Sequence, residues 1–286
     1  MSNEVLKGCL YVTGTPIGNL SDMSERVKKV LSEVDFIAAE DTRVTGKLLQ
    51  VIGTKKPMIS YFEHNKREKG EIIISRIKEG ESCALVSDAG MPAISDPGED
   101  LVKLAYEEGV QVFCVPGPSA TVSALAISGL ETGRFSFEGF LSTNKSDRRA
   151  HLEEIKNYKN TLIFYEAPHK LLDTLKAMLE VLGDRKISVV KELTKINEKV
   201  HLTTLSGAVS FYTENTPKGE FVLVIEGAKK QDEEQFWENM SVSEHVAHYL
   251  EEGCEKMDAM KKTARDRGVS KSVIYKEYTE CEKIHK

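Results

Sequence analysis

Two short polar segments in the first quarter of the chain carry side chains that can exchange protons or bind anions. Glu40-Asp-Thr-Arg43 follows an apolar run at 36–39, and Phe62-Glu-His-Asn-Lys-Arg67 follows a second apolar run at 58–61. Both runs are predicted as short strands, so these side chains stand where a strand ends. Two carboxylates and a guanidinium at such a place form either an exposed salt-bridge cluster or part of a site.

The stretch Ser87–Gly98 combines turn-forming residues with fixed negative charge. It holds two acidic turns, Ser87-Asp-Ala-Gly90 and Ser95-Asp-Pro-Gly98, and it follows a predicted strand at 82–86. Small residues at the end of a strand allow a ligand to approach the backbone closely. In open α/β sheets, ligands bind outside the carboxyl ends of the strands. The stretch is therefore either one wall of a ligand site or a polar connection without a ligand.

Two further turns expose backbone at predicted strand ends, Thr15-Pro-Ile-Gly-Asn19 and Pro116-Gly-Pro-Ser-Ala120. Neither is a nucleotide-binding fingerprint, because Gly14-Thr-Pro-Ile-Gly18 departs from G-x-G-x-x-G. The sequence also has neither a P-loop nor the G-x-S-x-G turn of a hydrolase. These patterns predict ligand loops without naming the ligand.

We predict no metal site. His245 and His248 share a helical face but have no third ligand nearby in the sequence, so both are predicted to be solvated. The five cysteines contain no C-x-x-C pair. Three of them lie in apolar runs and are predicted to be small buried hydrophobes in a reducing cytoplasm: Cys9, Cys83 and Cys114. An apolar targeting segment and a run of ~18 apolar residues are both missing, so we expect a soluble, cytoplasmic protein without membrane contact.

Alternating strands and helices must position these segments. Five alternations occur within about 120 residues, which is typical of a mostly parallel sheet with right-handed crossovers. The pattern restarts after Gly133, with strands expected at 135–140, 161–165, 187–192 and 220–226. A chain of 286 residues, 40% of them hydrophobic, can bury two such cores. We therefore predict two tandem α/β domains, an N-terminal one over 1–116 and a C-terminal one over 117–228.

A third segment, 229–286, is predicted to be a helical, basic tail. Residues 261–276 contain six basic residues and one acidic residue, and Gly268 separates two helical patterns with the spacing of a helix-turn-helix. The net charge of −6 argues against a protein coated in nucleic acid but leaves room for a local basic surface. The tail either docks on nucleic acid or forms a solvated helical hairpin that caps the second domain.

Seven segments occur in a fixed order along the chain: Thr15–Leu20, Ala39–Arg43, Ser87–Gly98, Pro116–Ala120, Phe164–His169, Lys191–Lys195 and Lys218–Glu220. Together they resemble the small-subunit ribosomal RNA methyltransferases of the tetrapyrrole methylase superfamily, over about residues 9–227. The basic tail resembles the helix-turn-helix tail of that family. Met91 stands where threonine is usual, and Lys170 stands where arginine is usual, which keeps the charge but removes a bidentate fork.

The resemblance implies S-adenosylmethionine as methyl donor, bound between the two α/β domains, and a homodimer. It also implies 2′-O-methylation of a cytidine ribose in the decoding region of 16S rRNA, so the partner would be 16S rRNA or the small ribosomal subunit. A sulfonium donor needs close backbone approach and nearby carbonyl or carboxylate dipoles, which the turns supply. Carried over by motif, the cofactor contacts are Thr15, Pro16, Gly18, Asn19, Ser87, Asp88, Ala89, Gly90, Ile94, Ser95, Ser119, Ala120, Tyr165, Gly219, Glu220 and Phe221.

A ribose hydroxyl is a poor nucleophile until a base removes its proton. The candidates for that base are Glu40, Asp41, His64, Glu166 and Glu192. The first two rank highest because they adjoin Arg43, which could bind the neighbouring phosphate. Each candidate could instead form a salt bridge at a domain interface, while Asp88 is expected to order a loop or contact the cofactor rather than act as the base.

Two other functions stay open. A methylase of the same fold could act on a small molecule such as a corrin or porphyrin precursor, although those enzymes resemble one another in a G-x-G-x-G-D first loop that Thr13–Asn19 lacks. The chain could also be a non-catalytic RNA-binding or assembly factor that retains a cofactor-shaped pocket.

Overall fold

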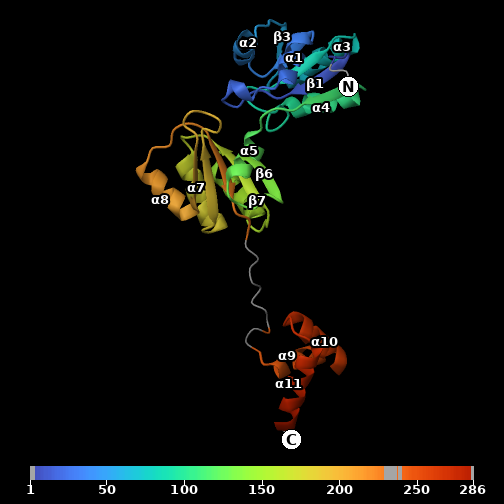
Figure 1. The fold of residues 1–286 in the computed structure, drawn as a ribbon, viewed down its shortest axis with the longest axis vertical. Coiled ribbons are helices and arrows are strands. Elements are labelled where there is room, and N and C mark those ends of the chain that lie inside the picture. Colours follow the sequence, from blue (N-terminus) through green and yellow to red (C-terminus); the bar gives the residue numbers. More distant parts are fainter. Residues whose placement is uncertain (1–3, 229–236, 238–239, 285–286) are drawn as a thin grey trace. The chain divides into compact units, whose positions relative to one another are not determined.

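A computed structural model describes the backbone of residues 4–228, 237 and 240–284. The chain divides into two compact units, Met1–Ala228 and Lys229–Lys286, which are described separately (Figure 1). The larger unit holds two five-stranded sheets. The boundary predicted at 116/117 falls in the segment between those sheets and stays a prediction, as does the division at 228/229.

The first sheet is entirely parallel. Its strands have the order β3-β2-β4-β1-β5, and every neighbouring pair runs in the same direction. This confirms the parallel α/β sheet predicted from the alternation of strands and helices. The strands are β1 (Cys9–Thr13), β2 (Phe36–Ala39), β3 (Met58–Ser60), β4 (Cys83–Val86) and β5 (Gln111–Val115).

Helices cover both faces of this sheet (Figure 1). On one face, α1 (Glu25–Glu33) and α2 (Thr42–Val51) pack on alternate strand residues, and on the other face α3 (Lys66–Lys78) and α4 (Gly98–Glu107) do so. A short 3₁₀ helix, η1 (Leu20–Asp22), precedes α1. The Ser24 hydroxyl caps α1 by accepting a hydrogen bond from the Val27 N–H at 3.2 Å.

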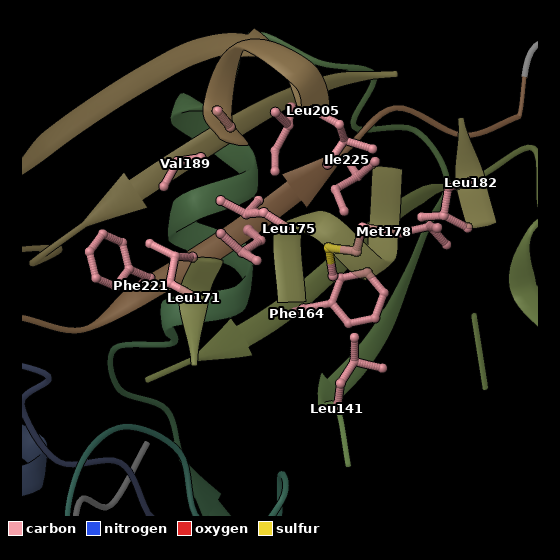
Figure 2. Close-up of a cluster of buried hydrophobic side chains, with 14 of the residues drawn as sticks. Leu141, Phe164, Leu171, Leu175, Met178, Leu182, Val189, Leu205, Phe221 and Ile225 are labelled. Atoms are coloured by element: carbon pink, nitrogen blue, oxygen red, sulfur yellow. The ribbon is translucent and has the colours of Figure 1, made fainter. Parts of the chain in front are cut away.

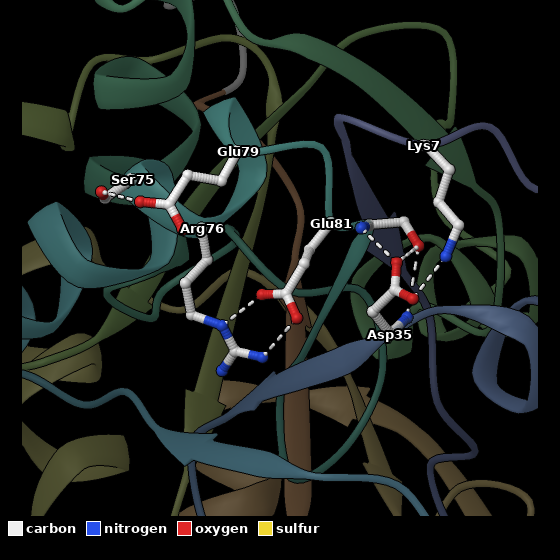
Figure 3. A network of polar contacts seen from close by, with 7 residues as sticks. Lys7, Asp35, Ser75, Arg76, Glu79 and Glu81 are labelled. Atoms are coloured by element: carbon white, nitrogen blue, oxygen red, sulfur yellow. Dashed lines mark hydrogen bonds and ion pairs between the residues drawn. The ribbon is translucent and has the colours of Figure 1, made fainter.

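A polar network clamps the amino ends of β2 and β4 (Figure 3). The Asp35 carboxylate accepts hydrogen bonds from the Ser82 N–H (2.6 Å) and hydroxyl (2.7 Å) and pairs with Lys7. Nearby, Arg76 pairs with Glu81 and stacks over the Phe36 ring at 3.8 Å. Burial alone would raise the pKa of Asp35, but the hydrogen bonds from Lys7 and Ser82 outweigh it and lower the pKa to about 2. These contacts stabilise the amino edge of the sheet. Ligands in open α/β sheets bind at the opposite, carboxyl edge.

The second sheet is mixed, with the strand order β6-β7-β10-β8-β9. Only β6 and β7 pair in parallel, while the other three pairs are antiparallel. Four of its strands fall where the sequence predicted them, and the fifth, β9, was missed. The elements are α5 (Ala120–Ile127), β6 (Phe135–Phe140), α6 (Lys145–Ile155), β7 (Thr161–Glu166), α7 (Leu171–Leu182), β8 (Lys186–Lys191), β9 (Lys199–Thr204), α8 (Leu205–Glu214) and β10 (Phe221–Ile225).

The core of this half lies between the sheet and helices α6–α8 (Figure 2). Phe164 of β7 and Leu171, Leu175 and Met178 of α7 are completely buried there. The opposite face is covered by α5, whose Ala124 and Leu125 pack on β7, β8 and β10. Since β10 lies in the centre and is buried along its whole length, its continuous apolar sequence is explained.

The described residues of the smaller unit form a three-helix bundle of α9 (Val242–Glu251), α10 (Lys256–Asp266) and α11 (Lys271–Ile284). The turn at Gly268, with φ +63°, joins α10 to α11 in the predicted helix-turn-helix order. The predicted start of the tail, 229–236, lies outside the described residues. The prediction for His245 was wrong: it is completely buried, it stacks on Trp237 with ring centroids 5.0 Å apart, and its Nδ1 accepts from Arg267 Nε.

The structure shows the exposure of the cysteines and whether the described residues form a metal cluster or a membrane-spanning helix. Cys9 and Cys83 are buried free thiols as expected, but Cys114 is exposed because its strand, β5, forms the edge of the first sheet. Among the described residues, no cluster of histidines, cysteines and carboxylates has the arrangement of a metal site. None of the described helices combines the length and the apolar character that crossing a bilayer would need.

Candidate active site

A cavity of about 500 Å³ opens at the carboxyl edge of the first sheet and is closed on its other side by the second sheet. The Ser87–Asp96 loop after β4 forms one wall, and Tyr165–Pro168 together with Glu220–Val222 form the wall opposite. Eleven residues that the sequence assigned to the cofactor line this cavity: Ser87, Asp88, Ala89, Gly90, Ile94, Ser95, Ser119, Ala120, Tyr165, Glu220 and Phe221.

The five other predicted cofactor residues do not line this cavity: Thr15, Pro16, Gly18, Asn19 and Gly219. The Thr15 N–H donates to the Gly90 carbonyl oxygen (2.8 Å), and the Gly90 N–H donates back to the Thr15 carbonyl oxygen (3.2 Å). Asn19 caps η1, and Gly219 packs on the Glu192 carboxyl group. Pro16 and Gly18 line a separate surface hollow beside α2. From this first turn, Ile17 is the side chain that reaches the cavity.

Glycines let the loops around the cavity approach one another. A methyl group on Gly14 would lie 2.6 Å from Gly117 Cα, so the turn after β1 and the segment after β5 touch backbone to backbone. A methyl group on Gly18 would lie 2.6 Å from Cγ of Lys195 in the second half of the unit. The first contact joins two loops of the first sheet, and the second joins the turn after β1 to the loop after β8 in the second sheet.

Backbone strain is concentrated beside the cavity. Among the described residues other than glycine, positive φ angles occur only in two loops, at Ala93 and Ser95 after β4 and at Glu192 and Thr194 after β8. Asp96 Oδ1 holds the first loop by accepting from the N–H groups of Ala93 (2.9 Å) and Gly98 (2.8 Å). Such strain persists where the surroundings fix the backbone, which is common at functional sites.

Glu40 and Asp88 link the ends of β2 and β4. The Asp88 N–H donates to Glu40 Oε2 (3.2 Å), and the Asp41 N–H donates to Asp88 Oδ1 (3.0 Å). Burial raises the pKa of Glu40, and the negative charges of Asp88, Asp96 and Asp41 raise it further. Burial also raises the pKa of Asp88. Both side chains line the cavity, so a proton-accepting carboxylate stands at its wall.

Asp41 has a different environment from Glu40. Its carboxylate caps α2 by accepting from the Arg43 N–H (2.7 Å), and it also binds the Arg43 guanidinium, with Nη2 at 2.6 Å from Oδ2. The hydrogen bonds from the Arg43 side chain and backbone lower the pKa of Asp41 to about 2. Neither residue lines the cavity. A carboxylate with so low a pKa is a weak base, so Glu40 is the stronger of the two candidates.

The other candidate bases are occupied or lie elsewhere. Glu166 lines the cavity, but its two carboxylate oxygens accept from the Ala167 N–H (2.8 Å) and from the Thr174 hydroxyl (2.5 Å). Glu192 lies outside the lining and accepts from the Glu220 N–H (2.9 Å) and Lys195 Nζ (3.1 Å). His64 is exposed in the turn after β3, beside Phe62, and also lies outside the lining.

Sequence reasoning missed the apolar part of the lining. The Phe140 and Tyr165 rings lie 5.5 Å apart, and the Tyr165 hydroxyl bonds to the Thr121 hydroxyl at 2.7 Å. Such residues resemble ordinary core in the sequence, and their place at the ends of predicted strands was the available signal. The lining residues that were not predicted are eight apolar ones and one acidic one: Ile17, Met91, Phe140, Ala167, Pro168, Val190, Leu193, Val222 and Asp96.

The charge of the cavity has one sign. Among the described residues that line it there are five carboxylates and no lysine, arginine or histidine: Glu40, Asp88, Asp96, Glu166 and Glu220. Carboxylates around an aromatic and apolar pocket favour a positively charged ligand of moderate size, because their field stabilises a cation.

Comparison with known proteins gives consistent matches. The model of the family described as Tetrapyrrole (Corrin/Porphyrin) Methylases matches residues 9–209. The chain is 50% identical to the ribosomal RNA small subunit methyltransferase I of Halalkalibacterium halodurans, over 95% of both chains. It is 46% identical to the protein of that name from Bacillus subtilis, over 95% of this chain and 94% of the relative.

A solved structure shares the fold at low sequence identity. The uroporphyrin-III-C-methyltransferase of Thermus thermophilus superposes with a TM-score of 0.56 and 17% identity, over 77% of this chain and 94% of the other. At that identity the likeness concerns the fold alone.

Proposed function

Since the chain belongs to the tetrapyrrole methylase family, we propose that it is an S-adenosylmethionine-dependent methyltransferase acting on small-subunit ribosomal RNA. The relatives named for that activity match nearly the whole chain, including the region of the helical tail. We further propose that the acceptor is the 2′-hydroxyl of a cytidine in the decoding region of 16S rRNA.

The negative cavity is the observation that carries the choice of cofactor. S-adenosylmethionine would supply an electrophilic methyl group on a positively charged sulfonium. The lining has five carboxylates and, among the described residues, no cationic side chain. Lys195, outside the lining, pairs with Glu220 at 2.9 Å, and the other four carboxylates favour such a charge. The Ser87–Gly90 and Ser95 loop offers backbone polar groups, and Phe140, Tyr165 and Leu193 offer apolar surface for the rest of the molecule.

The first turn would support the cofactor indirectly. Thr15 holds Gly90 through two backbone hydrogen bonds, and its hydroxyl donates to the Ser87 carbonyl oxygen at 3.2 Å. Gly219 leaves room for Glu192, which accepts from the N–H of Glu220 at the cavity. These contacts fix the loops before the cofactor binds, which limits the entropy lost on binding.

Glu40 is the proposed general base. It lies in the cavity wall, and its raised pKa makes it a better proton acceptor than Asp41. Arg43 is largely exposed next to it and is suited to bind a phosphate of the RNA. In this arrangement the base removes the hydroxyl proton while the walls of the cavity hold the two reactants in line.

The protein is also proposed to form a homodimer in the cytoplasm. Exposed apolar side chains support this: Val122 and Ile127 on α5, and Val200 and Leu202 on the edge strand β9. A methyl group on Gly129, just after α5, would lie 3.5 Å from Leu202 Cδ2, so the two groups adjoin.

Isothermal titration with S-adenosylmethionine tests the cofactor assignment directly. Saturable binding with one site per chain is expected. An absence of binding heat across several temperatures would remove both enzyme functions, on RNA and on a small molecule, and would leave a non-catalytic RNA-binding factor.

A further inference from the structure

A groove between α6 and α7 gathers positive charge away from the cavity. Its volume is about 330 Å³, and it is lined by four cationic and two acidic side chains: Lys145, Arg148, Arg149, Lys176, Asp173 and Glu180. Arg149 and Glu180 pair with each other at 2.7 Å. Three cations and a single carboxylate therefore remain to set the charge of the groove.

Arg148 occupies a position that would ordinarily hold an apolar residue. Helix α6 buries Arg148, Leu152 and Ile155, which are spaced four and three residues apart on one helical face. Arg148 is 9% exposed, yet it makes no hydrogen bond or ion pair with any residue that the structure describes. The side-chain nitrogens of Arg148 are not fully enclosed, so they are accessible from the groove that the side chain lines.

An unpaired guanidinium in this position is costly. Burial removes part of its hydration without providing a partner, and Lys145 and Lys176 add like charge nearby. Arg185, which is half-buried, has partners for two of its three nitrogens: Nε donates to the Leu182 carbonyl oxygen at 3.0 Å and Nη2 donates to that of Lys156, while Nη1 has none. An anion in the groove would give Arg148 the charge-assisted, forked partner that it lacks.

The groove lies on the same edge of the second sheet as the cavity. Helix α6 follows β6, whose last residue, Phe140, lines the cavity, and α7 follows the cavity residue Pro168. Strands β6 and β7 are parallel, with Phe140 opposite Tyr165. Since both helices begin where these strands end, Lys145 and Arg148 in the first turn of α6 stand near the site, and Lys176 follows in the second turn of α7.

We propose that the groove binds a backbone phosphate of the RNA substrate, with Arg148 as the central ligand. The identity of the anion rests on the proposed function, because the phosphodiester is the anion that an RNA carries. Lys145 and Lys176 add point charges on either side of the arginine.

The test compares Arg148→Met with Arg26→Met, which removes an exposed arginine from α1. Binding of a short fluorescein-labelled RNA is followed by anisotropy over a range of salt concentrations. Arg148→Met is expected to weaken RNA binding roughly tenfold and to reduce the slope of log affinity against log salt concentration (the salt slope) by about one. Arg26→Met is expected to change neither. The Tm of Arg148→Met should equal or exceed that of the wild type, because methionine continues the apolar stripe of α6.

The double variant Lys145→Ala/Lys176→Ala changes exposed positions only, so it keeps the test decisive if Arg148→Met unfolds. It should also weaken RNA binding and reduce the salt slope. Unchanged RNA affinity in both variants would overturn the proposal. It would also be overturned if inorganic phosphate raised the Tm of the wild type but not that of Arg148→Met while the two proteins bound RNA equally well. Titration of the wild type and both variants with S-adenosylmethionine tests the proposed function separately. If the wild type failed to bind it, the proposed function would be contradicted, but the RNA affinities of wild type and variants could still be compared.

Discussion

Two neighbouring carboxylates, Glu40 and Asp41, differ in what surrounds them, and that difference decides their chemistry. Glu40 stands in the cavity wall among other acidic groups, and burial raises its pKa. Asp41 is bound by Arg43 at the start of α2, and its pKa is lowered to about 2. The sequence ranks them together because they are adjacent, whereas the structure turns one toward the cavity and the other toward its own helix.

Replacing Glu40 by Gln should therefore lower kcat about 10²-fold or more, because the amide cannot accept the hydroxyl proton. The affinity for S-adenosylmethionine should change little. Since only the deprotonated carboxylate acts as a base, the wild-type rate should fall as pH drops through the raised pKa of Glu40. Single-turnover methylation of 30S subunits across a pH series would measure the loss of rate in the variant and the pH dependence of the wild-type rate.

Asp41→Asn serves as the matched control for that variant. It removes the partner of Arg43 and weakens the cap of α2, but it should reduce turnover less than tenfold. A larger loss in Asp41→Asn than in Glu40→Gln would transfer the role of base to Asp41.

Most of the site residues that the sequence identifies lie in turns, because turn chemistry is visible locally. Ser87–Gly90, Ile94, Ser95, Ser119 and Ala120 line the cavity, and their contact with a cofactor stays a prediction. Phe140 and Leu193 escaped notice because an apolar residue at a strand end looks the same whether it faces a core or a cavity. Only the pairing of β6 with β7 and the turn after β8 reveal which is the case.

At the scale of elements, the clamp at the amino ends of β2 and β4 predicts a dependence of stability on pH. The folded-state pKa of Asp35, about 2, lies below its usual value of 3.8. A depressed carboxyl pKa contributes stability above the usual value, and this stability is lost as pH falls from about 4 to about 2. Allowing for partial exposure, Asp35→Asn should cost about 1 kcal/mol at neutral pH.

Urea unfolding at pH 7 and at pH 3 would measure this contribution. The destabilisation by Asp35→Asn should shrink at the lower pH. An equal loss at both values would show that the carboxylate charge plays no part in the clamp.

The helical tail is expected to bind RNA and to leave the cofactor site untouched. The segment 261–276, which covers the end of α10, the turn after it and the start of α11, carries six basic residues. Ser272, Tyr275 and Lys276 are exposed on α11. A chain ending after Ala228 retains the whole compact larger unit, so it should bind S-adenosylmethionine normally. Its affinity for rRNA should fall and depend less on salt. Undiminished activity of the shortened chain on 30S particles would exclude a role for the tail.

Two elements, α2 and β9, were not predicted from the sequence pattern. Helix α2 was not predicted, because Glu40 and Arg43 beside its Asp41 cap were interpreted as a salt-bridge cluster or part of a site. Strand β9 alternates, but it lies at a sheet edge with Val200 and Leu202 exposed, so no buried face marks it. The central strands were predicted because continuous burial selects continuous apolar sequence.

For the whole molecule, the exposed apolar side chains of α5 and β9 predict association of two copies. Leu202→Glu places a charge in that surface, at a side chain that is 53% exposed in the single chain. Light scattering should give a dimer for the wild type and a monomer for the variant, with the Tm little changed. A variant that remains dimeric would move the interface to another surface.

This protein is proposed to place a methyl group on a ribose of 16S rRNA. Mass-spectrometric mapping of small-subunit rRNA from cells lacking the protein tests it most directly. One 2′-O-methyl group, on a cytidine of the decoding region, should be absent, and it should return with the wild-type chain but not with Glu40→Gln. An unchanged set of ribose methyl groups in the deficient cells would contradict the account.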